Sequence, residues 1–498
     1  MSPRGRLPVD WRGPRNPRRK SPPRIPRSLP IQPKVPRKLT VLVNHPSGHP
    51  PPEATAPHRK VYPRAVRGNI RTIRWWLTAA LQAILFFGPW LTWKGRQAVL
   101  FDLDTRHFYF FALNFWPQET YFLLIILVFA ALLLFASTAV AGRVWCGYAC
   151  PQTLLTESFI LVEGWIEGER ARAIKLDREP WHARKIALKA LKYGVWTVMA
   201  IWLGITFVAY FTPGNQLLVS LMLGQAAGST VMAIAFFAGL ALFDFGFFRE
   251  QFCHYLCPYA RFQGSMFDSD TLLVAFDRKR GEPRGKVGTG NAGDCVDCSL
   301  CVQVCPMGVD IRDGNQLECI NCTACLDACN SVMDRIGKPR GLVHYTSQNA
   351  EQGKKTHFLR PRVLVYATLL LALAGLFTYL MATRKMLEMA AVRGVTGGNV
   401  FAVTADGRIS NLYKLKIINK ENSDRTLLLS LDGFPGADLV TAKNPLVIPA
   451  DTAQVVSVLV VHSPKGLPPV QRFRIRAEDA DQPAVRGEAA TSFIGPGM

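Results

Sequence analysis

The chain has 498 residues, and its 59 Lys and Arg against 36 Asp and Glu give a formal net charge of +23. Such a charge would suit a nucleic-acid binder, but it is concentrated before Trp75 and between long apolar runs, which favours a membrane protein with basic cytoplasmic segments. All twelve cysteines lie in spaced motifs from Cys146 to Cys329, which leaves none for a secreted disulfide framework. We therefore expect no nucleic-acid partner, and we expect the cysteine-bearing part to lie in a reducing compartment.

Residues 1–60 are rich in proline and arginine, as in the run NPRRKSPPRIPRSLP. Such a segment cannot bury enough apolar surface to offset the entropy lost on ordering. It also lacks a continuous apolar core of signal-peptide length. We predict a disordered cytoplasmic tail with polyproline II character.

Five apolar stretches approach the ~20 residues that are needed to cross a bilayer. Two of them come from a single run, Tyr193 to Phe243, that carries no charge and is divided by a turn signal at Pro213 to Asn215. The predicted helices are 75–93, 120–142, 191–211, 226–247 and 361–384. The first four belong to a segment 61–260, and together the five would form a transmembrane bundle in the lipid bilayer.

The distribution of Lys and Arg predicts the orientation of this bundle. Basic residues crowd the amino-terminal tail and the loop 143–189, whereas the loop 94–119 has three and the loop 212–225 has none. The positive-inside rule then places the amino terminus in the cytoplasm and the carboxyl terminus in the periplasm. We expect a protein of the bacterial inner membrane, with residues 261–360 in the cytoplasm.

Residues 261–360 contain CVDCSLCVQVCP and CINCTACLDACN, and each run has the C-x₂-C-x₂-C-x₃-C spacing of bacterial ferredoxins. In two-cluster ferredoxins the fourth cysteine of each run binds the other cluster. The rule assigns one [4Fe–4S] cluster to Cys295, Cys298, Cys301 and Cys329, and a second to Cys319, Cys322, Cys325 and Cys305. Structural zinc sites usually have longer gaps between paired cysteines. Asn330 replaces the second expected proline, which predicts a less constrained last turn.

Two further motifs, WCGYACPQ and EQFCHYLCPYARFQ, stand where the second and fourth predicted helices reach the cytoplasm. The i, i+4 spacing predicts that both thiols of a pair lie on one helix face. Because these two helices run in the same direction, the four thiols would share one membrane depth. Cys146, Cys150, Cys253 and Cys257 are therefore a candidate copper site or a third cluster site. The alternative is four buried apolar cysteines.

Residues 392–498 change to short runs of alternating or clustered apolar residues, separated by turn residues. The runs are 413–419, 426–431, 453–461 and 471–477. This pattern is typical of an immunoglobulin-like β-sandwich, here without the disulfide of antibody domains. We find no catalytic constellation in it and expect a periplasmic docking module.

From about residue 60 to 498, the chain resembles the FixG/CcoG family (also called RdxA-like) of cytochrome c oxidase accessory proteins. The resemblance rests on VYPRAVRGNIRTIRW, FDLDTRHFYFFALNFWPQE, WCGYACPQT, FREQFCHYLCPYARFQG, the double ferredoxin run and MDRIGKPRGLVHYTSQN. It implies a bacterial inner-membrane protein that helps to assemble the cbb-type oxidase by reducing Cu(II) to Cu(I). Its implied partners are copper ions, copper transporters and the oxidase biogenesis proteins.

The sequence thus predicts a multi-domain membrane protein: a five-helix bundle, an inserted two-cluster ferredoxin domain and a carboxyl-terminal immunoglobulin-like sandwich. Electron transfer is the expected activity, since iron–sulfur clusters carry single electrons. Two other functions stay open, a quinol-linked electron-transfer subunit and a non-catalytic assembly scaffold. No motif identifies the electron donor.

Overall fold

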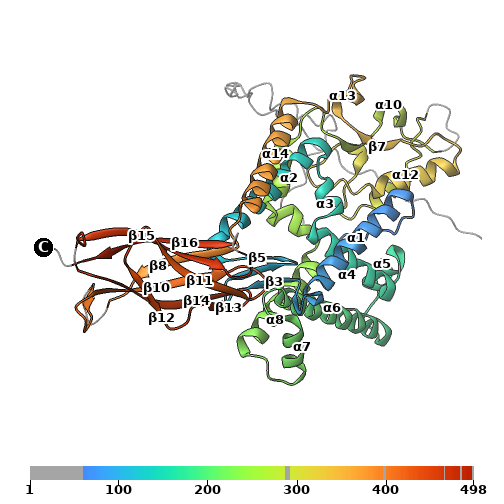
Figure 1. The fold of residues 1–498 in the computed structure, drawn as a ribbon. Helices are drawn as coiled ribbons and strands as arrows, with labels where there is room; N and C mark the ends of the chain where they lie inside the picture. The colour runs from blue at the N-terminus through green and yellow to red at the C-terminus, as the bar shows by residue number, and fades with distance from the viewer. Residues whose placement is uncertain (1–59, 287–291, 396–399, 465, 483–484, 496–498) are drawn as a thin grey trace, which may run out of the picture. The chain divides into compact units, whose positions relative to one another are not determined.

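The computed structural model describes residues 60–286, 292–395, 400–464, 466–482 and 485–495 (Figure 1). The prediction of a disordered tail falls on residues that lie outside these ranges.

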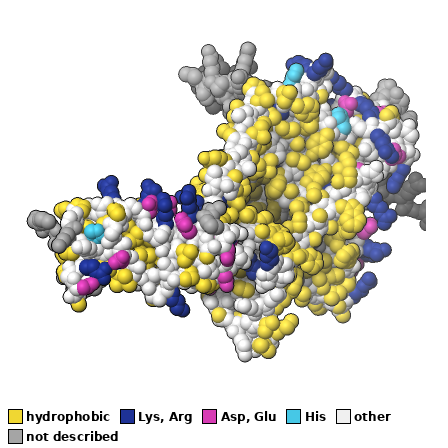
Figure 2. All heavy atoms as spheres, in the orientation of Figure 1, with side chains coloured by type: hydrophobic (Ala, Val, Ile, Leu, Met, Phe, Trp, Pro, Cys, Tyr) yellow, Lys and Arg dark blue, Asp and Glu magenta, His cyan; other side chains and the backbone are white. Residues whose placement is uncertain are grey.

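Four helices in the described part of the chain are long and apolar enough to cross a membrane, where the sequence predicted five. They are α2 (Thr120–Ala141), α6 (Ala183–Ala209), α8 (Gly228–Ala241), which continues as the π-helix η4 (Leu242–Phe248), and α14 (Pro361–Ala382). On the face shown in Figure 2, hydrophobic side chains gather over the helical part of the molecule, and most Lys and Arg lie outside it. The chain is an integral membrane protein.

The first helix differs from its prediction. Helix α1 covers Asn69–Phe87 rather than 75–93, because Pro89 lacks the backbone donor that a longer helix would need. It also carries Arg74, which is only 2% exposed and forms an ion pair with Glu157 at 2.7 Å. These polar positions lower its apolar character, so a fifth crossing stays a prediction.

Helices α2 and α14 run antiparallel. At one end Arg360 donates to the carbonyl oxygen of Ala139 at 2.9 Å, and at the other Arg384 pairs with Glu119 at 2.7 Å. The cysteine-rich insert precedes α14 and the carboxyl-terminal sandwich follows it. The two domains therefore leave this helix pair at opposite ends, and which end faces the cytoplasm is a prediction from charge alone.

The connections between the predicted helices contain structure of their own. The loop 94–119 contains a three-stranded sheet in the order β3–β4–β5. Its strands are β3 (Val99–Asp102), β4 (His107–Phe110) and β5 (Leu113–Phe115), beside the hairpin β1 (Thr92–Trp93) and β2 (Arg96–Gln97). Other connections form helices α3 (Val144–Tyr148), α4 (Pro151–Glu167), α5 (Arg170–Arg178) and α7 (Gly214–Met222). Strands of two to four residues are too short for a hydrophobic alternation to show.

The insert is closed by a two-stranded antiparallel sheet, β6 (Leu273–Phe276) and β7 (Val343–Thr346). Its helices are α9 (Pro258–Met266), α10 (Arg278–Gly281), α11 (Leu300–Gln303), α12 (Ala324–Arg335) and α13 (Gln348–Glu351). The expectation of a loose turn at Asn330 is wrong, because α12 runs through this residue. A proline there would interrupt the helix, whereas the Asn330 side chain accepts a hydrogen bond from the amide of Gly341 at 2.9 Å.

The carboxyl-terminal domain consists of two antiparallel sheets, ordered β12–β14–β10–β8 and β13–β11–β15–β16, with β9 paired to β10. The strands are β8 (Leu387–Arg393), β9 (Ala402–Val403), β10 (Ile409–Asn419), β11 (Arg425–Asp432), β12 (Asp438–Thr441), β13 (Leu446–Ile448), β14 (Thr452–His462), β15 (Val470–Asp479) and β16 (Arg486–Ile494). Leu415, Ile475 and Phe493 are fully buried in its core. The four runs named from the sequence lie in β10, β11, β14 and β15.

Candidate metal centres

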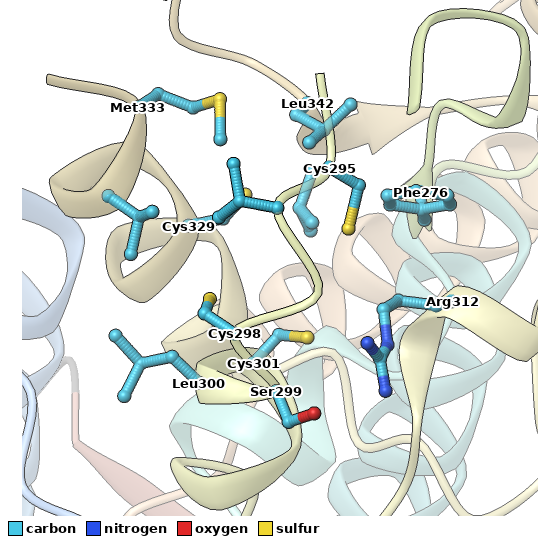
Figure 3. Close-up of a pocket in the computed structure, with 13 residues that line it drawn as sticks. Phe276, Cys295, Cys298, Ser299, Leu300, Cys301, Arg312, Cys329, Met333 and Leu342 are labelled. Atoms are coloured by element: carbon cyan, nitrogen blue, oxygen red, sulfur yellow. The ribbon is translucent and has the colours of Figure 1, made fainter. Parts of the chain in front are cut away.

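Four of the predicted ligands line one cavity in the insert, which we call the outer cavity (Figure 3). Its cysteines are Cys295, Cys298, Cys301 and Cys329, and its empty space is about 370 Å³. Cys298 is exposed to solvent. Arg312 also lines the cavity, and its charge is balanced by Asp310 at 2.6 Å and Asp297 at 2.5 Å.

The other four predicted ligands line a second cavity, the inner cavity, with about 360 Å³ of empty space. These four are Cys305, Cys319, Cys322 and Cys325. Cys301 lines both cavities, so the two are neighbours. Each cavity is thus lined by one of the quartets that the crossing rule predicts, with residues from both runs at each, and the assignment of ligands to clusters stays a prediction.

The backbone around the two cavities repeats an unusual conformation. The residues on either side of the middle cysteine are left-handed in both runs: Asp297 (φ 50°) and Ser299 (φ 52°), then Asn321 (φ 53°) and Thr323 (φ 61°). Non-glycine residues rarely adopt positive φ, and such positions concentrate at functional sites. The tight C-x₂-C-x₂-C spacing therefore bends the chain around the cavity in both halves.

Each quartet fits an iron–sulfur cluster. The thiols of the outer cavity surround an apolar space that Phe276 and Met333 also line. Burial raises the pKa of Cys329 to about 12 and that of Cys305 to about 12. Metal binding has to displace these protons, and a cluster bound by thiolates supplies the compensating positive charge. When bound, a [4Fe–4S] cluster carries single electrons.

The two CxxxCP motifs adopt one common turn, which differs from the prediction of two thiols on one helix face. Cys150 is extended and precedes Pro151 at the start of α4, and Cys257 is extended and precedes Pro258 at the start of α9. The first cysteine of each pair lies in the preceding short helix, α3 for Cys146 and the π-helix η5 (Phe252–Leu256) for Cys253. A proline disfavours helical geometry in the residue before it, so the helix breaks at the second cysteine.

The four thiols are neighbours in the structure, and a metal bound by all four of them stays a prediction. Burial raises the pKa of Cys253 to about 12, and the nearby thiols of Cys150, Cys146 and Cys257 act in the same direction. Cys146 also contacts the side-chain oxygen of Gln263 at 3.3 Å. Among the described residues, no three His, Cys, Asp or Glu side chains are arranged to hold a single metal ion. We call Cys146, Cys150, Cys253 and Cys257 the four-thiol site.

The four-thiol site adjoins the inner cavity. Cys146 and Cys253 pack against the hydrophobic cluster that contains Ile320 and Cys322. Gly147 lies so close that a Cβ atom there would stand 2.6 Å from the carbonyl oxygen of Ile320 and 3.1 Å from the Cα of Cys322. The hydroxyls of Tyr148 and Thr323 are 2.8 Å apart. Only glycine allows the CxxxCP turn to come this close to the ligand loop.

Helix α1 holds the Gly147 turn and helix α12 together through two hydrogen bonds. The Asp327 carboxylate on α12 accepts a hydrogen bond from the backbone amide of Arg71 at 2.7 Å, and so caps the start of α1. One turn later, Arg74 donates through Nε to the carbonyl oxygen of Gly147 at 2.7 Å. A single helix thus binds both the cluster helix α12 and the four-thiol site.

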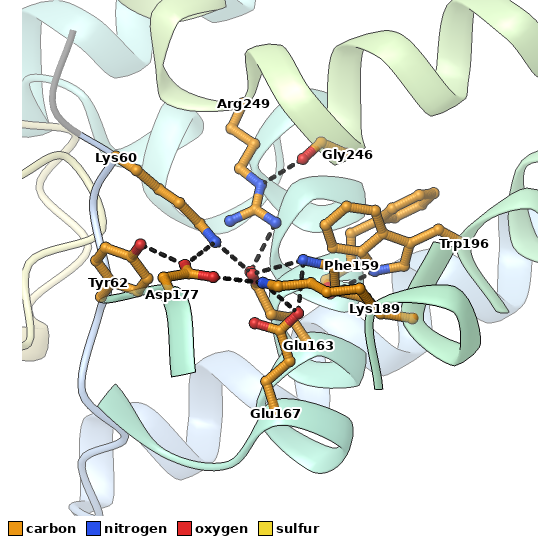
Figure 4. A network of polar contacts seen from close by, with 11 residues as sticks. Lys60, Tyr62, Phe159, Glu163, Glu167, Asp177, Lys189, Trp196, Gly246 and Arg249 are labelled. Carbon is orange, nitrogen blue, oxygen red and sulfur yellow. Dashed lines mark hydrogen bonds and ion pairs between the residues drawn. The ribbon is translucent and has the colours of Figure 1, made fainter. Parts of the chain in front are cut away.

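A buried ion-pair network surrounds Glu163 of helix α4 (Figure 4). Glu163 accepts from Lys60 and from Arg249, each at 2.7 Å, and Lys192 lies at 3.4 Å. Burial works to raise the pKa of Glu163, but these cations outweigh it and hold the pKa at about 2. The carbonyl oxygen of Arg249 in turn accepts from Gln152 at 3.4 Å. The network therefore links helix α4 to the chain that leads into Cys253.

Sequence reasoning missed the residues that position these sites, namely Arg74, Gly147, Asp327 and the network partners of Glu163. Most of them act through contacts with residues more than 70 positions away, for which the sequence offers no local signal. Gly147 was the exception, since a glycine inside a CxxxC turn indicates a close backbone approach.

Family models match three segments of the chain. A "4Fe-4S dicluster domain" matches residues 248–348, and a "4Fe-4S binding domain" matches residues 122–167. An "IG-like fold at C-terminal of FixG" matches residues 377–496. The dicluster match confirms the prediction of two [4Fe–4S] clusters, and the third match supports the immunoglobulin-like class of the sandwich.

Three curated proteins are similar over most of the chain. RdxB of Cereibacter sphaeroides is 38% identical over 450 residues, covering 84% of this chain and 92% of RdxB. RdxA of the same organism is 38% identical over 448 residues, covering 86% of this chain and 95% of RdxA. The nitrogen fixation protein FixG of Rhizobium meliloti is 35% identical over 427 residues, covering 77% of this chain and 81% of FixG. The chain therefore belongs to the FixG/RdxA-like family of membrane iron–sulfur proteins.

Proposed function

We propose that this protein transfers electrons through its iron–sulfur insert to the four-thiol site and there reduces Cu(II) to Cu(I). The reduced copper would serve the assembly of a cbb-type cytochrome c oxidase. The observation that carries this proposal is the contact of Gly147 with Ile320 and Cys322, which puts the four-thiol site against the inner cavity. The ligands we assign to the two clusters are the outer and inner quartets as they line their cavities.

The chemistry is balanced by one electron. Cu(II) would gain one electron and become Cu(I), and a cluster held by the insert would supply that electron. Thiolates are soft ligands that favour Cu(I) over Cu(II), so the four-thiol site would retain the product of the reduction. An external one-electron donor has to restore the insert, and the exposed Cys298 makes the outer cavity the natural point of entry.

A third cluster at the four-thiol site is the second candidate. It is favoured by the "4Fe-4S binding domain" match, which spans Cys146 and Cys150 although no ferredoxin spacing occurs there. In that case the protein would be an electron-transfer subunit, and copper would bind elsewhere or not at all. The two candidates differ in the metal that depends on these thiols.

Pairwise Cys→Ser replacement separates the candidates. The C146S/C150S and C253S/C257S proteins are purified without oxygen, and their iron and copper are measured beside the wild type. Loss of copper binding and of cupric reduction, with iron unchanged, supports the copper site. Loss of about four Fe per chain identifies a third cluster. If neither metal nor the reduction of Cu(II) changes, the proposed function is wrong.

Location and partners belong to the same proposal. With the insert in the cytoplasm and the sandwich in the periplasm of the inner membrane, copper transporters and oxidase biogenesis proteins would be reached from the periplasmic side. The sandwich offers two sheets for docking and no catalytic cluster was expected in it.

A further inference from the structure

Arg143 joins the two CxxxCP turns. It follows the end of α2, is only 3% exposed, and its carbonyl oxygen accepts from the Gly147 amide at 3.2 Å, so it lies one helical turn before Cys146. Its guanidinium donates through Nη2 to the carbonyl oxygen of Ala260, three residues after Cys257. One buried cation therefore touches the chain on both sides of the four-thiol site.

The charge of Arg143 has no carboxylate partner within the part of the chain that the structure describes, and its Nε has no hydrogen-bond partner there. The other buried arginines in that part all form ion pairs with carboxylates. These pairs are Arg74 with Glu157, Arg249 with Glu163, Arg312 with Asp310 and Arg360 with Asp268. Arg143 is thus the exception, and it lies beside the thiols.

A guanidinium stays protonated in proteins, so burial cannot be relieved by loss of the proton. A buried charge without a partner is strongly unfavourable. The carboxyl-terminal end of α2 and the carbonyl oxygen of Ala260 supply only partial negative charge. Full compensation of this charge requires an anion close to the guanidinium.

Metal–thiolate centres are such anions, because each deprotonated cysteine adds one negative charge. The inner edge of the site carries a second unpartnered donor, Nδ2 of Asn321, which is 1% exposed; the Oδ1 of the same residue lies 3.6 Å from the Cys319 thiol. Buried donors without partners and a buried cation therefore converge between the four-thiol site and the inner cavity. Both features favour a negatively charged bound group.

We propose that Arg143 is the counter-charge of an anionic metal–thiolate centre at the four-thiol site, and that it raises the reduction potential of this centre. The inference rests on the proposed function and adds a residue whose charge sets the reduction potential of the four-thiol centre. A nearby cation stabilises the reduced form, which carries one more negative charge than the oxidised form. At the outer cavity Arg312 is neutralised by Asp310 and Asp297, so no equal effect arises there. The difference favours the movement of electrons toward the four-thiol site.

The test compares R143M, which removes the charge, with R143K, which keeps it. Full-length proteins are purified without oxygen, iron and copper per chain are measured, and redox titration followed by EPR gives the midpoint potential of each signal. The signal lost in C146S/C150S identifies the four-thiol centre. R362M removes an exposed arginine at the start of α14, which lies beside the end of α2, and controls for net charge.

We expect R143M to shift the potential of the four-thiol centre downward, R143K to retain most of the wild-type value, and R362M to leave it unchanged. The outer centre should not move in any of them. An unshifted potential in R143M, or an equal shift in R143K, refutes the inference. If R143M does not load metal, loading by R143K supports the role of the charge, and failure of both variants shows a purely structural role. If the wild type holds no metal that depends on the four thiols, the proposed function itself fails.

Discussion

Replacement of Gly147 by alanine tests the contact between the four-thiol site and the inner cavity. The added Cβ would stand 2.6 Å from the carbonyl oxygen of Ile320, whereas ordinary van der Waals contact begins at 3.4 Å. The obstacle is backbone, which cannot rotate away as a side chain would. Helix α3 and the ligand loop must therefore separate by about 0.8 Å, the difference between these two distances. Overpacking of this kind costs about 1–3 kcal/mol of stability.

The separation should slow electron transfer between the inner cavity and the four-thiol site without removing either site. We expect G147A to keep the iron of the insert and to reduce bound Cu(II) more slowly. Stopped-flow spectroscopy measures the reduction. Iron analysis shows whether the clusters survive.

Gly164→Ala is the matched control. Gly164 lies in the middle of helix α4, and a Cβ atom there would meet nothing within 4 Å. The G164A protein should behave as the wild type in both measurements. An unchanged rate of Cu(II) reduction in a folded G147A protein would refute the reasoning, as would an equal loss in G164A.

Three further predictions concern the ion pairs, the topology and the tail. Glu163→Gln leaves the cations around it unneutralised and should lower the stability of the solubilised protein by on the order of 3 kcal/mol, as measured by thermal unfolding. In the wild type this carboxylate has a folded pKa of about 2 against 4.5 when unperturbed, so its stabilisation is complete above about pH 4.5 and is lost as the pH falls toward 2; a pH-independent difference between E163Q and wild type over that range would contradict it. A phosphatase reporter fused after Met498 should be active and one fused near Gly341 inactive, and the reverse pattern would overturn the topology. Deletion of residues 1–58 should leave the iron content unchanged, because their composition cannot form a core; loss of clusters would show that this segment supports the insert.

Much of the metal chemistry could be predicted from the sequence because cluster ligands follow local spacing. A thiol run that wraps one cluster spans only a dozen residues, and the crossing rule then supplies the fourth ligand from the other run. Each cavity in the structure is lined by one of these quartets, and Cys301 lines both. Long apolar runs and the alternating strands of the sandwich are likewise local patterns, and they located most helices and the longer strands.

Local periodicity failed where a single residue overrides it. The i, i+4 spacing of the CxxxCP pairs indicated one continuous helix, but Pro151 and Pro258 end the preceding helix at Cys150 and Cys257. In the same way Pro89 ended the first helix early. The proline after Cys329 is absent, and there the helix α12 continues through Asn330.

What only the tertiary structure decided is how the sites are joined. The amide of Arg71 contacts Asp327, 256 residues away, and Arg74 contacts Gly147, 73 residues away. Gly147 of helix α3 in turn lies against Ile320 of the insert. The role proposed for Arg143 likewise depends on its hydrogen bond to Ala260 and on the lack of a carboxylate partner in the described structure. Ligand spacing is written within a dozen consecutive residues, whereas these contacts depend on where folding places segments that are remote in the chain, and no local pattern encodes that placement.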